Sequence, residues 1–327
     1  MQNLKTTNSF RLVPKRNISG ILLLDKHEGI SSSSALVKAR GIFRALKGGH
    51  TGALDPLASG LLPICLGEAA KFSSYFLEGN KKYIATGTLG RTTTTCDREG
   101  DIVIERPIGN ALEKFPEVIK KFHGKIIQVP PIYSAVKVAG KPLYKYARQG
   151  KEVEIPQREI EIFYIKLLET TDTSFTVEVY CSKGTYIRTL ISDIGEALGC
   201  GAFVSMLRRT FVEGLPQDKM ITLDELQDLA DGREDRSDFT KLDELLYPLE
   251  LAVQRLPLVE LPYEMAEPLT HGVRQGPDFS RAILPEDLSG PLQVRYNGIF
   301  IGVCEFKNSQ LIPLRMMAPE CMQGTGN

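Results

Sequence analysis

The sequence predicts an α+β fold with a small β-rich domain at its C-terminal end. Segments with helical spacing of apolar residues mix with strand-like segments over most of the first 230 residues. Residues 251–327 instead alternate short apolar runs with proline and glycine, which is typical of short strands. The length of 327 residues favours two domains, because one domain commonly spans about 100–200 residues. We therefore expect domains at 1–250 and 251–327.

The first predicted elements are a buried strand and a basic helix. Residues 19–26 (SGILLLDK) form a short apolar run that ends in polar residues, as buried strands do. The serines at 31–34 offer an N-cap, and apolar residues then recur at helical spacing until Gly48 and Gly49, where we expect the helix to end. Its polar positions carry lysine and arginine. A second helix is expected at 68–77 and a strand at 82–89.

The middle of the chain predicts a hairpin followed by a helix. Residues 158–169 and 174–181 alternate in the manner of two antiparallel strands, with a turn at 171–173. Residues 185–198 then carry apolar side chains at helical spacing, and Gly199 is placed to end that helix.

A basic surface insertion is predicted at about residues 131–158. Prolines and glycines interrupt this part of the chain, and Tyr133, Tyr144 and Tyr146 lie among lysines and arginines. Aromatic rings among positive charges suit base stacking and phosphate contact.

The last third of the chain is acidic. Residues 221–250 hold ten acidic against three basic residues, and ITLDELQDLA within them predicts a capped helix, so this stretch reads as a connector. Beyond it, Asn297 and Gly298 are a strong signal for a β-hairpin turn.

Charge is distributed unevenly although the net charge is zero. Residues 1–220 contain 31 basic and 22 acidic side chains, whereas residues 221–327 contain 9 and 18. A basic surface attracts polyanions such as nucleic acid. Charge alone is equally compatible with a solvated surface that has no partner.

Several classes of protein are disfavoured. The longest apolar run near the N-terminus, Ile21 to Leu24, is too short for a membrane span or a signal peptide, so we expect a cytoplasmic protein. The six cysteines are widely spaced and predict reduced thiols. The common phosphate-loop, dinucleotide, hydrolase and metalloprotease motifs do not occur. None of the four histidines has metal-ligand spacing, so we expect no metal.

One acidic residue stands out. Residues 48–66 (GGHTGALDPLASGLLPICL) surround Asp55 with glycine, proline and apolar residues. A lone carboxylate there is costly unless it caps a helix, pairs with a cation or reacts. The Asp55-Pro56 pair also fits a helix N-cap followed by proline at the first helical position, so local sequence leaves both interpretations open.

Six ordered blocks of the chain resemble the bacterial TruB family of tRNA pseudouridine synthases. They cover residues 20 to 214 and read GILLLDKHEGISS, GHTGALDPLASGLLPICLGEAAKF, KKYIATGTLGRTTTTCDREGDI, QVPPIYSAVKVAGKPLYKYARQG, CSKGTYIRTLISDIGEALG and FVSMLRRTFVEG. The resemblance implies the pseudouridine-synthase fold, with a mixed, largely antiparallel sheet flanked by helices. Residues 251–327 match weakly and are expected, by position and composition, to form a PUA-like RNA-binding domain.

The resemblance also implies the site. The family's catalytic aspartate corresponds to Asp55, which favours the reactive interpretation over the cap. Its active-site tyrosine corresponds to Tyr83, and the G-T-Y-I-R block places the next two residues at Tyr186 and Arg188. The remaining family positions are the base-displacing histidine, a lysine that orders the loop or meets a phosphate, and a pocket leucine, which fall on His50, Lys71 and Leu207. We expect Arg188 to pair with Asp55 through its planar fork and to keep the carboxylate pKa low despite burial.

Two departures from the family pattern are visible. His27 stands where proline is usual, and Ala70 replaces the usual threonine. Neither change affects the acid.

The expected reaction is the isomerisation of uridine to pseudouridine at position 55 in the T loop of tRNA. The base would be flipped out, and the N-glycosidic bond broken and rejoined through C5. Atoms are neither added nor lost, so we expect no cofactor, no metal and no membrane partner. The partner is the T arm of tRNA, met by a monomer. A tRNA-folding chaperone and a guide-RNA-dependent synthase are the alternatives, and the short C-terminal end disfavours the latter.

Overall fold

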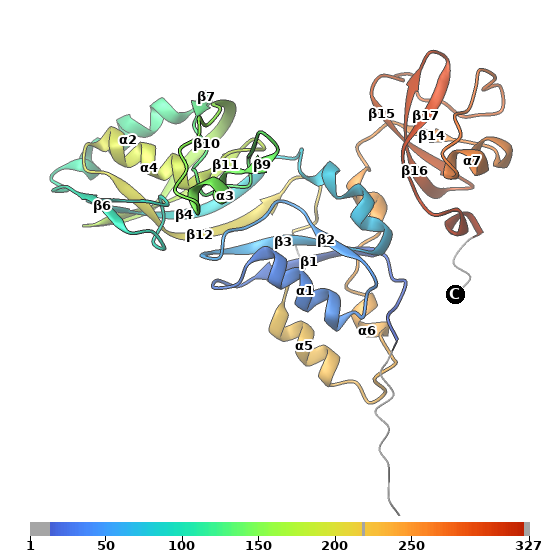
Figure 1. Cartoon of the computed structure of the whole chain (residues 1–327), viewed down its shortest axis with the longest axis horizontal. Coiled ribbons are helices and arrows are strands. Elements are labelled where there is room, and N and C mark those ends of the chain that lie inside the picture. Colours follow the sequence, from blue (N-terminus) through green and yellow to red (C-terminus); the bar gives the residue numbers. More distant parts are fainter. Residues whose placement is uncertain (1–13, 218–219, 324–327) are drawn as a thin grey trace, which may run out of the picture.

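The computed structural model describes residues 14–217 and 220–323, so the outer limits of both predicted domains, residues 1 and 327, lie outside the described residues. Among these residues, one large sheet forms the centre of the molecule, and a smaller sheet lies apart from it near the C-terminal end (Figure 1). The strands of the large sheet are β1 Gly20–Lys26, β2 Gly48–His50, β3 Ala58–Leu66, β4 Lys81–Leu89, β7 Gly124–Gln128, β10 Arg158–Thr171, β11 Ser174–Cys181, β12 Ala202–Val212 and β13 Ile221–Thr222.

The large sheet is mixed and mostly antiparallel, which confirms the predicted fold class. Its order is β13-β1-β3-β12-β4-β11-β10-β7, and β2 also pairs with β3. Within this sheet as described, only β1 with β13 and β3 with β12 run parallel. The β3–β12 pairing joins the two halves of the sheet and brings the segment after Asp55 beside Leu207.

Helices cover each half of the sheet. The helices are α1 Ser32–Ile42, α2 Ala111–Ile119, α3 Leu143–Ala147, α4 Ile187–Leu198, α5 Leu223–Asp231, α6 Thr240–Asp243 and α7 Tyr263–Thr270. Figure 1 shows α1 and α5 beside the half that contains β1 and β3, and α2 and α4 beside the half that contains β4, β10 and β11. Apolar side chains of both halves form one continuous core.

The predicted helix before Gly48 ends earlier than expected. It begins with Ser31, whose hydroxyl accepts a hydrogen bond from the Ser34 amide, but its last residue is Ile42. Arg44 has a φ of 55°, a left-handed conformation that an α-helix cannot continue. The Leu46 amide then donates to the Arg16 carbonyl instead of to the helix, which explains the early end.

The predicted helix at 68–77 is a 3-10 helix. This element, η1 Gly67–Phe76, ends with an i to i+3 bond from the Leu77 amide to the Ser74 carbonyl. The other 3-10 helices are η2 Lys120–Phe122, η3 Leu249–Ala252 and η4 Pro319–Gln323. Apolar spacing alone does not distinguish these two kinds of helix.

Other predicted elements are confirmed. The hairpin at 158–181 forms as β10 and β11. Gly199 ends α4 in the left-handed conformation, with a φ of 92°. Thr222 and Glu225 make a reciprocal capping box at the start of α5. The five cysteines whose side chains are described are free thiols, whereas the side chain of Cys321 lies outside the described residues.

The insertion at 131–158 is broken into short pieces, as expected. It contains the ribbon of β8 Lys137–Val138 and β9 Lys141–Pro142, followed by α3. A separate ribbon is formed by β5 Arg91–Thr93 and β6 Ile102–Glu105.

The C-terminal sheet has its own core. Its strands are β14 Leu258–Glu260, β15 Pro291–Tyr296, β16 Ile299–Lys307 and β17 Gln310–Met316. Asn297 and Gly298 have φ values of 48° and 73° and form the predicted tight turn. A second buried apolar cluster, which includes Val259, Leu292 and Ile301, forms the core of this part of the chain.

The C-terminal sheet contacts the main body through η1. The Phe72 and Phe300 rings lie 5.1 Å apart in an edge-to-face arrangement, and Phe72 is fully buried. In the part of the chain that is described, no helix is both long and apolar enough to cross a membrane.

Phe72→Ala should loosen this contact. Truncating a buried phenylalanine costs about 3–5 kcal/mol of unfolding free energy, because it leaves a cavity and removes the ring pair. Urea denaturation, with limited proteolysis of the segment after Val253, measures the effect. Tyr263→Ala, at a residue that is 55% exposed, is the control. Equal losses in the two variants would contradict a role for Phe72 in holding the two parts together.

Candidate active site

Five of the seven predicted site residues meet at one cavity. Its volume is about 250 Å³. The lining residues come from five segments: Ala53, Leu54 and Asp55; Tyr83; Ser134 and Ala135; Thr185, Tyr186, Ile187 and Arg188; and Leu207. A cavity whose walls combine apolar side chains with a few convergent polar groups is typical of a ligand-binding site.

Two buried side chains hold the backbone of the loop that carries Asp55. Ser32, which is buried, accepts a hydrogen bond from the Leu54 amide at 2.7 Å and donates to the Leu54 carbonyl at 2.9 Å. Lys26 is fully buried, and its ammonium donates to the Ile30 carbonyl at 2.8 Å and to the Pro56 carbonyl at 3.4 Å. These contacts hold the residues on both sides of Asp55.

Asp55 does not cap a helix. The Ala58 amide donates to the Asp55 carbonyl at 3.0 Å in a turn, and β3 begins at Ala58. The helix N-cap interpretation of Asp55-Pro56 is therefore wrong. Strand β3 is buried at eight of its nine positions, and a strand buried on both faces lacks the alternation that would have predicted it.

Arg188 connects four acceptors around the cavity. It lies in the first turn of α4 and is 4% exposed. Its Nε donates to Asp55 Oδ2 at 2.9 Å, and its Nη1 lies 3.3 Å from Asp97 Oδ2. Nη1 also donates to the Thr95 carbonyl at 3.1 Å, and Nη2 to the Tyr133 carbonyl at 2.8 Å.

The predicted partner of Asp55 is thus present, but not in the predicted geometry. Arg188 offers Asp55 a single N–H rather than its planar fork, because the other nitrogens are engaged elsewhere. Asp97 in turn is 2% exposed and accepts from Thr95 Oγ1 at 2.6 Å. The guanidinium therefore links the Asp55 loop to the β5–β6 segment and to the insertion.

The expectation of a low pKa for Asp55 is wrong. Burial raises the pKa of this carboxyl above its ordinary value, and the negative charge of Asp97 raises it further. Arg188 and Lys26 lower the pKa but do not compensate for lost hydration. The fold therefore disfavours the charged form of Asp55 relative to the unfolded chain.

Tyr83 lies on β4, directly opposite Arg209 on β12. Burial raises the pKa of its hydroxyl, while the positive charge of Arg209 lowers it. Leu207, also on β12, is 5% exposed and pairs with Ala58 at the start of β3. Tyr186 precedes α4, and its amide donates to Gln128 Oε1 at 2.8 Å.

Two predicted site residues do not line the cavity. His50 lies on β2, and its Nδ1 is buried with no hydrogen-bond partner among the described residues. Burial and the charge of Arg209 lower its pKa, which favours the neutral ring. Lys71 lies on η1, 2.5 Å from Glu68 Oε2, and donates to the Met316 carbonyl at 3.1 Å. Lys71 thus contacts the C-terminal sheet.

Sequence reasoning missed several residues of the site. Lys26, Asp97 and Arg209 stand in the family blocks without an assigned role, and Ser32 was considered only as a helix cap. Each is a polar residue that the fold buries beside Asp55 or Tyr83. A buried charge leaves no periodic signal in a single sequence, so only their contacts identify them.

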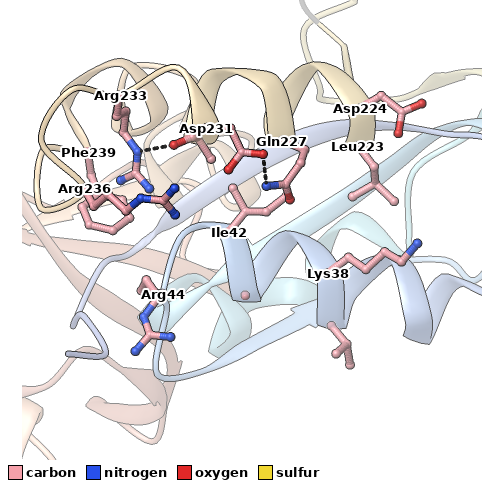
Figure 2. A pocket seen from close by; sticks show the side chains of 13 residues that line it. Lys38, Ile42, Arg44, Leu223, Asp224, Gln227, Asp231, Arg233, Arg236 and Phe239 are labelled. Atoms are coloured by element: carbon pink, nitrogen blue, oxygen red, sulfur yellow. Dashed lines mark hydrogen bonds between the residues drawn. The ribbon is translucent and has the colours of Figure 1, made fainter. Parts of the chain in front are cut away.

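A larger pocket lies elsewhere. It occupies about 660 Å³ between α1 and α5, and Figure 2 shows Lys38, Arg44, Arg233 and Arg236 among its lining side chains. Among the described residues, none of the predicted site residues lines it.

Arg188→Lys should destabilise the protein although the charge is kept. A lysine ammonium cannot reach four acceptors, so at least one buried carbonyl or carboxylate would lose its partner, at about 1–3 kcal/mol. Chemical denaturation measures the loss. Arg208→Lys is the control, because its partly exposed pair with Asp25 should matter by less than about 1 kcal/mol. An Arg188→Lys protein as stable as the control would show that the four contacts contribute little.

Comparison with known families gives a consistent result. The pattern described as TruB family pseudouridylate synthase (N terminal domain) matches residues 40–187, and that of the tRNA pseudouridylate synthase B C-terminal domain matches residues 188–254.

Relatives cover most of the chain. The tRNA pseudouridine synthase B of Vibrio parahaemolyticus is 50% identical over 259 residues, which is 79% of this chain and 82% of that protein. The protein of the same name from Idiomarina loihiensis is 43% identical over 314 residues, covering 95% of this chain and 97% of that protein.

Two solved structures of Cbf5 complexes share the fold. A Cbf5-Nop10-Gar1 complex contains a chain with a TM-score of 0.65 and 28% identity, covering 94% of this chain and 81% of that one. A Nop10-Cbf5 complex of the archaeal box H/ACA sRNP gives a TM-score of 0.66 at 24% identity, covering 93% and 88%, and supports the fold alone. With ordered family blocks, two matching family patterns and relatives at 43–50% identity, the chain belongs to the TruB family of pseudouridylate synthases.

Proposed function

We propose that this enzyme converts uridine to pseudouridine in tRNA, at position 55 of the T loop. The observation that carries the proposal is the Asp55 carboxylate at the cavity wall, held by Arg188 Nε at 2.9 Å. The relatives named tRNA pseudouridine synthase B support tRNA as the substrate. The family resemblance supports the T-loop position.

The reaction needs a nucleophile and a proton acceptor. The N1–C1′ bond breaks, the C5–C1′ bond forms, C5 loses a proton, and N1 takes one up. Asp55 is the nucleophile in this proposal, attacking C1′, assisting glycal formation, or adding to C6 of the ring. Each route requires the ionised carboxylate, which Arg188 stabilises by direct contact. The balance of atoms calls for no cofactor.

The other residues hold the base. Flipping a stacked base costs a few kcal/mol, and a close-fitting pocket offsets this cost. Tyr83 would stack on the uracil, with its hydroxyl near the edge where C5 loses its proton. Tyr186 and Leu207 would complete the walls. His50, kept neutral by burial and by Arg209, would fill the place that the base leaves in the T loop.

Two further parts would bind the rest of the tRNA. The basic insertion at 131–158 and the basic side of α1 would contact the phosphate backbone, so affinity for tRNA should fall as the salt concentration rises.

We also propose that residues 251–327 form a PUA-like RNA-binding domain, separate from a catalytic domain at 1–250. Lys71 would then fix this domain rather than touch the substrate, because it bonds to Met316.

The enzyme would act without a guide RNA. One Cbf5 chain of similar fold comes from an archaeal box H/ACA sRNP complex, whereas the relatives at 43–50% identity are named tRNA pseudouridine synthase B. Purified protein and an unmodified tRNA transcript alone should therefore suffice. A requirement for added RNA would favour the guide-dependent alternative.

Asp55→Asn should remove activity and spare the fold. Loss of the nucleophile should lower the single-turnover rate by at least about a thousandfold. A raised folded-state pKa means that the ionised carboxylate costs stability above the ordinary pKa of 3.8, so the neutral amide should leave the melting temperature at pH 7 equal or higher. Carbodiimide modification with primer extension detects the product, and filter binding measures tRNA affinity. A normal rate in this variant would rule out Asp55 as nucleophile. A loss of turnover with intact tRNA affinity would show that Asp55 serves the chemistry, which a protein that acts only as a tRNA chaperone would not need.

Asp97→Asn should shift the acid limb of the pH–rate profile to lower pH. The Asp97 charge raises the pKa of Asp55, so its removal stabilises the Asp55 carboxylate and lowers that pKa. The plateau rate should also fall, because Arg188 loses one of its supports. Single-turnover rates measured from pH 8 down towards the ordinary carboxyl pKa of 3.8 record both effects. An acid limb that moves to higher pH would contradict the assigned cause.

A further inference from the structure

A second cavity adjoins the one that contains Asp55. Its volume is about 750 Å³, and Ala53, Tyr83, Ala135, Thr185 and Tyr186 line both cavities. Its cationic lining residues are Lys81, Lys137, Arg158, Lys183 and Arg209. Its one acidic lining residue among those described, Glu159, lies 3.3 Å from Lys125 and is thus partly neutralised.

Arg209 is buried behind Tyr83 with part of its guanidinium unused. It is 2% exposed, and its Nε donates to the Leu61 carbonyl at 2.7 Å. Its Nη2 is buried and has no hydrogen-bond partner among the described residues. Gly52 makes room for this group, because a Cβ on that residue would lie 3.0 Å from Nη1.

Arg158 presents a second unused donor at the same cavity. Its guanidinium lies 5.8 Å from the centre of the Tyr186 ring. Its Nε is buried without a hydrogen-bond partner in the described part of the chain. Arg158 begins β10 and Arg209 lies on β12, so rigid strands carry both groups.

Two of the three neighbouring lysines are already engaged, and the third, Lys137, is exposed. Lys81, 8% exposed, donates to the Leu77 carbonyl at 2.8 Å and also to the Gly79 carbonyl. Lys183 pairs with Glu78. The two arginines are therefore the cations of this cavity with buried N–H groups left over.

Buried N–H groups of a cation are costly to leave without acceptors, so they indicate a ligand that supplies them. The ligand must be anionic and rich in oxygen, and guanidinium groups bind phosphate through paired, charge-assisted hydrogen bonds. A nucleotide whose base enters the Asp55 cavity brings its flanking phosphates to the rim of that cavity, where this second cavity opens.

We propose that Arg158 and Arg209 form a subsite for a backbone phosphate next to the flipped uridine. The subsite rests on the proposed function, since it holds the same nucleotide by its other end. Its contacts with the phosphate would form only when the nucleotide is flipped, so they would stabilise the flipped state. It would also fix the sugar so that C1′ faces Asp55.

The experiment combines protein and substrate changes. Arg209→Gln and Arg158→Gln are compared with Arg208→Gln, a matched control on the same strand whose guanidinium bonds to Asp25 at 2.9 and 2.6 Å and does not line the cavity. Each is titrated with a T-arm stem-loop, and with stem-loops that carry a neutral methylphosphonate on the 5′ or the 3′ side of the target uridine.

Each cavity variant should weaken binding of the normal stem-loop by about tenfold. The slope of the logarithm of the binding constant against the logarithm of the salt concentration should become smaller in magnitude by about one. One of the two methylphosphonates should weaken the wild type similarly, and the variants should lose little more on that substrate. Two outcomes would overturn the proposal. In one, the arginine variants lose as much affinity on each methylphosphonate stem-loop as on the normal stem-loop. In the other, Arg208→Gln loses as much affinity as the cavity variants.

Two further measurements guard against misfolding and separate the proposals. Arg158→Gln is at a half-buried position, so it still tests the subsite if Arg209→Gln unfolds. Inorganic phosphate should compete with the stem-loop for wild type and compete less for Arg158→Gln, and equal competition would count against the subsite. Since binding is measured directly, an active Asp55→Asn protein would overturn the proposed nucleophile without altering this result.

Discussion

A single buried guanidinium, that of Arg188, organises the site. Its Nε contacts Asp55, and its other nitrogens reach Asp97 and the carbonyls of Thr95 and Tyr133. These acceptors belong to three segments that are far apart in sequence. Because arginine keeps its charge when buried, it can hold two carboxylates in one place where a neutral donor could not. The cavity around Asp55 depends on this arrangement.

The arrangement places Asp55 in a balance between two opposing effects. Burial and Asp97 favour the neutral acid, whereas Arg188 and Lys26 favour the carboxylate. Asp55 reacts as the carboxylate in our proposal, and its raised pKa means that this ionised form costs folding free energy. The fixed backbone contacts of Ser32 and Lys26 keep the loop in place despite that cost.

The central sheet explains how the two cavities come to lie side by side. Strand β12 pairs with β3 on one side and with β4 on the other, so Leu207, Arg209, Gly60 and Tyr83 meet at one crossing. Gly60 is required there, because a Cβ at its φ of 98° would lie 2.2 Å from the Arg209 carbonyl oxygen. In our proposals, one cavity takes the base and the other takes the phosphate, and Tyr83 and Tyr186 form the wall between them.

The sequence by itself determined the fold class, the hairpin at 158–181, the end of α4 at Gly199, the capped helix α5 and the family, because each depends on local spacing, capping or ordered motifs. It also named five residues that line the cavity. Tertiary structure decided the rest. It ended α1 at Ile42, made η1 a 3-10 helix, moved Lys71 to the C-terminal sheet and raised the pKa of Asp55. It also showed Asp97, Arg158 and Arg209 at the site. Burial and long-range pairing set these features, and neither is encoded in the spacing of neighbouring residues.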